Sequence, residues 1–111
     1  MVFMVLALAT GCAATPDGNR SLAGSALYHK AERLYQAGHY KKAKEYFHAY
    51  IANHPDSDLY KVALYYLGHC YQMSGNNKEA LSLYNRVIGK YSDDDFWVRA
   101  AKKRIEEISG L

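Results

Sequence analysis

A shift of 37 residues superimposes the sequence on itself, and this internal repeat constrains the fold more than any other feature of the chain. The matching pairs are Ala26 with Ala63, Leu27 with Leu64, Tyr28 with Tyr65, Gly38 with Gly75, Lys41 with Lys78, Ala43 with Ala80, Ile51 with Ile88 and Asp56 with Asp93. A period of this size indicates stacked supersecondary units that bury their apolar faces only against one another. With 111 residues in all, the chain has room for one such domain.

Within each unit the apolar residues are spaced as on an amphipathic helix. Leu27, Ala31 and Leu34 recur at steps of three or four, and the same spacing resumes at Tyr40 after a break at Gly38. The second unit repeats this design around a break at Gly75 to Asn77. The spacing therefore predicts two helical hairpins, with small residues such as Ala43 and Ala80 where the helices of a hairpin cross.

These residues resemble the tetratricopeptide repeat at the spacing of that family. The resemblance is carried by Leu27, Ala31, Leu34, Gly38, Tyr40, Ala43, Phe47 and Pro55, and again by Leu64, Leu67, Gly68, Tyr71, Gly75, Ala80 and Tyr84. It implies an all-α, right-handed antiparallel helical-hairpin solenoid of two repeats, followed by a capping helix over about 94–109. The tetratricopeptide-like domain is expected to span 25–111.

The first twelve residues have the outline of an export signal. An apolar run over 2–9 is followed by Thr10, Gly11 and Cys12, and it is far shorter than the roughly 20 apolar residues of a membrane-spanning helix. The end of this run resembles the bacterial lipobox, which implies a signal peptide over 1–11 and a lipid on Cys12. We expect a flexible tether over 12–24, because that segment holds Pro, Gly, Asn and Ser without a helical period. The open alternative is an uncleaved anchor or a buried helix start.

Together, the 37-residue step, the lipobox and the turn at His54 to Ser57 resemble periplasmic tetratricopeptide lipoproteins of the outer-membrane assembly and Tol-Pal coordinator type. This resemblance implies a periplasmic protein held by lipid at the outer membrane or, as the less favoured option, at the inner membrane. Ala13 after the cysteine, in place of Asp, favours the outer membrane.

A partner protein or peptide is expected on the inner surface of the solenoid, which the first helices of successive hairpins line. The predicted groove residues are Tyr28, His29, Tyr35, Tyr65, Tyr66, His69, Met73, Arg99, Lys102 and Lys103. Aromatic and cationic side chains suit a peptide with apolar anchors and some acidic character. About half of the groove tyrosines are expected to pack structurally, and Tyr46, Tyr71 and Tyr84 almost wholly so.

Other classes of function lack their residues. The five histidines and Cys70 do not have the spacing of a metal site, and neither a phosphate-binding loop nor a nucleophile motif is present. We therefore expect no enzyme activity, metal or cofactor, and a buried structural Cys70. The net charge is +3, and the basic residues are scattered, so a nucleic-acid partner is disfavoured.

The leading functional hypothesis is a membrane-tethered adaptor of the bacterial cell envelope. One alternative is a self-associating structural module or homo-oligomer, which would use an apolar face of the last helix around Phe96, Trp97, Ile105 and Ile108. Another is a cytoplasmic regulatory tetratricopeptide protein that retains its first twelve residues. The Asp-rich segments 56–58 and 93–95 are expected to cap the helices that follow them.

Overall fold

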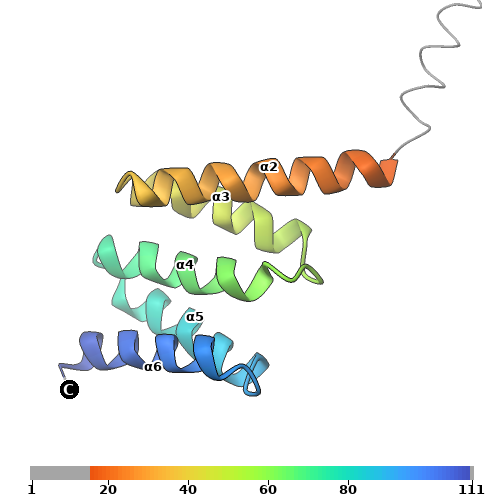
Figure 1. The fold of residues 1–111 in the computed structure, drawn as a ribbon. Coiled ribbons are helices and arrows are strands. Elements are labelled where there is room, and N and C mark those ends of the chain that lie inside the picture. Colours follow the sequence, from red (N-terminus) through yellow and green to blue (C-terminus); the bar gives the residue numbers. More distant parts are fainter. Residues whose placement is uncertain (1–15, 111) are drawn as a thin grey trace, which may run out of the picture.

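The computed structural model describes the backbone of residues 16–110 and the side chains from Gly24 onward. Within this part of the chain the helices are α2 (Pro16–Gln36), α3 (Tyr40–Asn53), α4 (Tyr60–Met73), α5 (Asn77–Lys90) and α6 (Asp95–Ser109), with no strand. They form two antiparallel hairpins, α2–α3 and α4–α5, followed by α6 (Figure 1). The prediction of an all-α helical-hairpin solenoid is confirmed. None of the described helices is both long enough and apolar enough to cross a membrane.

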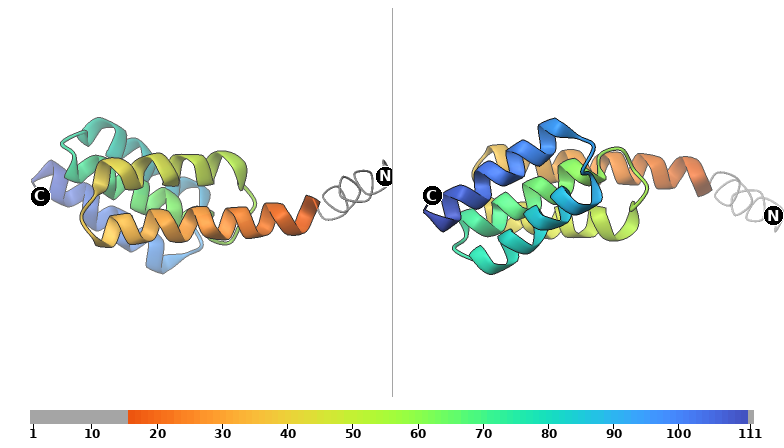
Figure 2. Two further views of the ribbon diagram at one scale, coloured as in Figure 1. Left: turned by 90° about the horizontal axis from the view of Figure 1, so that it is seen from above. Right: turned by 90° about the horizontal axis from the view of Figure 1, so that it is seen from below.

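The first helices of the units form one side of the stack. Figure 1 shows α2, α4 and α6 on the near side with α3 and α5 behind them, and the views from above and below agree (Figure 2). Helix α4 contacts α2 on one flank and α6 on the other. We call the side formed by α2, α4 and α6 the inner face.

The two hairpin turns have the same conformation. Gly38 and Gly75 have φ angles of 84° and 85°, a left-handed conformation that glycine adopts without a steric penalty. Just after these glycines, the His39 N–H donates to the Leu34 carbonyl and the Asn76 N–H to the Tyr71 carbonyl, both at 2.8 Å. These bonds satisfy carbonyls at the ends of α2 and α4, as in a Schellman motif. The repeat in the sequence is therefore a repeat of turn geometry.

The core is built from large rings packed among small residues. Ala31, Ala43, Ala63, Ala80 and Ala101 are fully buried, as are Phe47, Leu64, Leu67, Tyr84 and Val87. A Cβ atom added to Gly68 in α4 would lie 2.8 Å from Cε1 of Tyr84 in α5. The absence of a side chain at Gly68 is therefore what allows the Tyr84 ring to lie against α4.

The N-terminal part of α2 differs from the expected tether. The predicted tether covered 12–24, whereas the described chain is helical from Pro16, so residues 16–24 continue the helix of the first unit. Proline is tolerated in a first helical turn because no intrahelical donor is needed there. The His54 ring packs directly against Gly24. An added Cβ atom at Gly24 would lie 2.6 Å from His54 Nε2, so a larger residue there would overlap the ring. The signal peptide and Cys12 lie outside the described residues.

The two linkers fulfil the predicted capping role only in part. Leu59 and Asp94 occupy the N-cap positions of α4 and α6, and neither makes a side-chain capping bond. Ser57 Oγ accepts the Leu59 N–H at 3.1 Å in the first linker. In the second, the Asp94 carboxylate pairs with Lys61 Nζ at 2.6 Å, and this bond lowers the pKa of Asp94. Asp94 thus connects the start of α6 to the start of α4.

Replacing Gly68 with Ala should destabilise the protein by about 1 to 3 kcal/mol, because the new methyl group overlaps a fully buried ring. Urea unfolding followed by circular dichroism measures this change. Gly89→Ala is the matched control, since Gly89 is exposed in α5 and an added Cβ would meet no atom within 4 Å. That substitution should stabilise the helix by about 0.4 to 1 kcal/mol. Equal midpoints for the two variants would contradict the packing described above.

Candidate functional site

A row of three aromatic side chains crosses the inner face, one from each helix. The ring of Tyr66 in α4 lies 4.7 Å from that of Tyr35 in α2 and 6.4 Å from that of Trp97 in α6, measured between ring centroids. All three side chains are half-buried. We call Tyr35, Tyr66 and Trp97 the aromatic row. It offers ring surface that is partly open to solvent and continuous across three helices.

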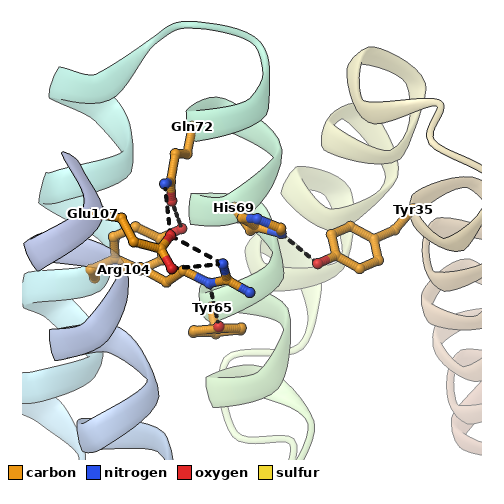
Figure 3. Close-up of polar contacts among 7 residues, drawn as sticks. Tyr35, Tyr65, His69, Gln72, Arg104 and Glu107 are labelled. Carbon is orange, nitrogen blue, oxygen red and sulfur yellow. Dashed lines mark hydrogen bonds and ion pairs between the residues drawn. The ribbon is translucent and has the colours of Figure 1, made fainter.

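Tyr35 and His69 connect α2 to α4. The Tyr35 hydroxyl is hydrogen-bonded to His69 Nδ1, between two helices whose backbones come close at only a few positions (Figure 3). Burial lowers the pKa of His69, and the nearby Arg104 guanidinium lowers it further, while Glu107 opposes this effect. The imidazole at this seam is therefore held in its neutral form to a lower pH than an ordinary histidine.

A second set of polar side chains connects α4 to α6. Arg104 donates from Nε to the Tyr65 hydroxyl at 2.8 Å and from Nη1 to the Glu107 carboxylate at 3.1 Å (Figure 3). Gln72 donates to Glu107 Oε1 at 3.2 Å and accepts from the Tyr84 hydroxyl at 2.7 Å. The Arg104 bond is the main cause that lowers the pKa of Glu107. The network thus runs from a buried tyrosine to the surface and orients α6 on α4.

Two of the predicted groove residues belong to the core. Tyr28 is 4% exposed and packs edge-on against Phe47 and Tyr50 of α3. Tyr65 is 8% exposed, and its ring lies between those of Tyr84 and Trp97. This corrects the expectation that both would line a groove, because the neighbouring helices reach across the face on which these side chains lie.

Three of the other predicted groove residues lie together on the inner face, and two more are exposed. Tyr35, Tyr66 and His69 form a contiguous group that spans α2 and α4. His29 is exposed and lies 3.7 Å from the Glu32 carboxylate, measured from Nδ1. Met73, near the end of α4, is 53% exposed. These residues keep solvent-accessible surface that a partner could contact.

The predicted basic lining of the groove lies elsewhere on α6. Arg99, Lys102 and Lys103 are exposed, but Arg99 follows Trp97 by two positions and so lies about 200° away from it around the helix. Trp97 faces α4, so Arg99 points away from the aromatic row. Arg99 is therefore not part of a groove with Tyr66 and His69, and the groove role of Lys102 and Lys103 stays a prediction.

The sequence reasoning missed three inner-face residues, Trp97, Arg104 and Glu107, and had assigned Trp97 to an association face. A signal for Arg104 was present, because it lies on the apolar stripe of α6 with Ala101 and Ile108. A charged residue on such a stripe indicates a polar partner on the next helix, here Tyr65. No comparable signal marked Glu107, which is placed by Arg104 and Gln72.

The structure also places the other residues to which the sequence gave a structural role. Tyr84 is fully buried, as predicted, whereas Tyr46 and Tyr71 are half-buried beneath the ammonium groups of Lys30 and Lys44. Cys70 is buried, as predicted, and burial raises the pKa of its thiol to about 12. Among the described side chains no three His, Cys, Asp or Glu residues gather as a metal ion would require.

Repeated antiparallel hairpins with one shared face define an α-helical repeat protein. The family model of the tetratricopeptide repeat matches residues 26–105, which is most of the chain. The chain belongs to the tetratricopeptide repeat family. Such domains generally mediate protein–protein interactions, and the family is typically non-enzymatic. Comparison with curated proteins and with solved structures found no match for the chain.

The lowered pKa of His69 predicts that the protein loses stability as the pH falls below about 6.5, the ordinary histidine value. Below that pH the His69 imidazole takes up a proton in the unfolded chain but stays neutral in the folded chain. The free energy of unfolding therefore falls with the pH until the pH drops below the pKa of His69 in the folded state. His69→Gln should reduce this loss. Burial also lowers the pKa of His48, so His48 should account for a further part of this loss of stability. The substitution His48→Gln should remove that part. Urea midpoints measured from pH 8 to pH 5 test this; an unchanged slope in both variants would contradict it.

Proposed function

We propose that this protein is a membrane-tethered adaptor of the bacterial cell envelope, which binds a partner protein or peptide on its inner face. The observation that carries the proposal is the aromatic row, because Tyr35, Tyr66 and Trp97 form a half-buried aromatic surface across three helices. Tyrosine and tryptophan are the residues that most often dominate binding energy at interfaces. Within the described residues, no further helix covers this side of the stack.

The chemistry around the row suggests how a partner is held. Glu32 and His29 lie toward the α2 end of the inner face, whereas the Arg104–Glu107 pair lies toward the α6 end. A partner segment with apolar or aromatic side chains would pack on the rings, and its polar groups would bond at both ends. Tyr35 already bonds to His69, and Arg104 and Gln72 already bond to Glu107. The surface is therefore organised before the partner arrives, which lowers the entropic cost of binding.

The membrane part of the proposal is supported by the sequence around Cys12 and by where α2 begins. Only residues 13–15 lie between Cys12 and the first turn of α2 at Pro16. A lipid on Cys12 would therefore hold the hairpin stack near the bilayer. Two or three acyl chains, at about 0.8 kcal/mol for each buried methylene, are sufficient for stable anchoring.

A photo-crosslinking amino acid in place of Tyr66 should crosslink the full-length protein to its partner in cells, because position 66 is the centre of the aromatic row. The matched control is the same substitution at Tyr46, another half-buried tyrosine, which lies under Lys30 between α2 and α3. Denaturing gels and mass spectrometry identify the adducts. Crosslinks of equal yield from both positions, or from position 46 alone, would remove the inner face from the proposal.

Mass spectrometry of the protein isolated from its native membrane should find a mature N-terminus at Cys12 that carries acyl groups. Cys12→Ala should abolish incorporation of labelled fatty acid. Cys70→Ala should leave incorporation intact, because Cys70 is the buried cysteine of α4. An intact, unmodified N-terminus at Met1 would contradict the membrane tether while leaving the partner-binding face untouched.

A further inference from the structure

The end of the stack carries one exposed aromatic side chain set between charges of opposite sign. Phe96 is 64% exposed, more than Met73, the other large apolar side chain exposed in the described chain. Two open depressions meet at Phe96. One is lined by the acidic turn at 93–95 with Lys90 and Tyr91, and the other by Arg99, Ala100 and Lys103. We call Asp93, Asp95, Phe96, Arg99 and Lys103 the end patch.

The end patch lies on the side of α6 that does not pack against α4 or α5. Trp97, Ile105 and Ile108, which the sequence suggested as an apolar association face, are half-buried against the core. This corrects the expected association face, because only Phe96 of those four residues is exposed. Helix α6 packs on α5 and α4, and the second helix of a third hairpin is absent from the described residues.

Charge is ordered along this patch. Asp93 and Asp95 precede Phe96, and Arg99 and Lys103 follow it along α6. All four side chains are exposed, and none of them forms an ion pair within the described part of the chain. Asp94, between the two acidic residues, is instead engaged by Lys61. The patch therefore has an acidic half and a basic half, with an aromatic ring between them.

We propose that the end patch binds a second copy of this chain, with the two α6 helices antiparallel about a twofold axis. A twofold contact pairs the same surface of both copies, so the surface must be complementary to itself. Antiparallel α6 helices place the acidic half of one patch against the basic half of the other, whereas parallel helices would place like charges together. An axis near the midpoint of Phe96 and Arg99 sets each Phe96 ring against the Arg99 guanidinium of the second copy, a favourable cation–π pair.

The same geometry brings Lys103 of one copy close to Asp93 of the other, because the two residues lie almost equally far from that midpoint along the chain. The contact covers about one helix length and has a single aromatic anchor. It therefore belongs to the smaller, reversible class of interfaces. It also leaves the aromatic row of the inner face uncovered, since Trp97 and Phe96 point in different directions from α6.

The test mixes two full-length copies, labelled at the C-terminus with a donor dye and an acceptor dye, and measures energy transfer as the protein concentration rises. Transfer should rise to a plateau for the wild type. Phe96→Ala should raise the half-maximal concentration about tenfold or more, as expected for removal of a central aromatic anchor. Met73→Ala is the matched control and should leave the titration unchanged.

Charge reversal tests the twofold arrangement itself. Arg99→Glu with Lys103→Glu should weaken association of that variant with itself, and Asp93→Lys with Asp95→Lys should do the same. A mixture of these two variants should associate more tightly than either variant does with itself, because each acidic half then meets a basic half again, although one of the two Phe96–Arg99 pairs stays lost. This rescue also shows that both variants are folded.

Two results would overturn the proposal. If the mixed variants associate no better than either variant alone, the patches do not meet in this orientation. If the wild type shows no energy transfer at any concentration, the patch does not bind a second copy.

Discussion

The close approach of helices over small residues is the constraint on which the rest of the structure depends. In the second hairpin the Tyr84 ring lies directly on Gly68, and the 37-residue repeat places Phe47 and Ala31 at the same positions of the first. Burial of one such ring contributes about 1.5 to 3 kcal/mol, but only if the helix axes come close enough to exclude water. The spacing of α2, α4 and α6 follows from these crossings, and so does the continuity of the aromatic row.

Polar bonds determine how the first helices align along the inner face. The seams between them carry Tyr35 with His69, then Tyr65 with Arg104, and then Gln72 with Glu107. Such bonds have preferred directions, so they fix the register of the helices more closely than apolar contacts of similar area. Tyrosine suits this position because its ring packs in the core while its hydroxyl reaches the polar seam. The same feature gives a partner a surface with both rings and hydrogen-bonding groups.

The sequence predicted the hairpins, the glycine turns and the buried Cys70, because each of these depends on local spacing or on residue type. It misplaced features that depend on contacts between distant segments. Helical spacing predicts on which side of its helix each of Tyr28 and Tyr65 lies. It does not predict how much of these side chains α3 and α6 cover. The sequence around Gly24 indicates a linker, yet in the structure Gly24 contacts His54, thirty residues later in the chain. In the same way, the sequence around Asp94 predicts the start of a helix but not the ion pair that Asp94 forms with Lys61.

Helix α6 shows how one helix can take part in two separate surfaces. Trp97 and Phe96 are neighbours in sequence but lie about 100° apart around the helix, so one joins the inner face and the other stays exposed. Arg104 and Arg99 also lie on different sides of α6. Arg104 is bonded to Tyr65, whereas Arg99 has no ion-pair partner among the described residues. A partner on the aromatic row and a second copy at the end patch would therefore contact different sides of α6. Because neither would cover the other's residues, pairing of two chains would bring two inner faces together and raise the effective concentration of binding sites for a partner that can reach both.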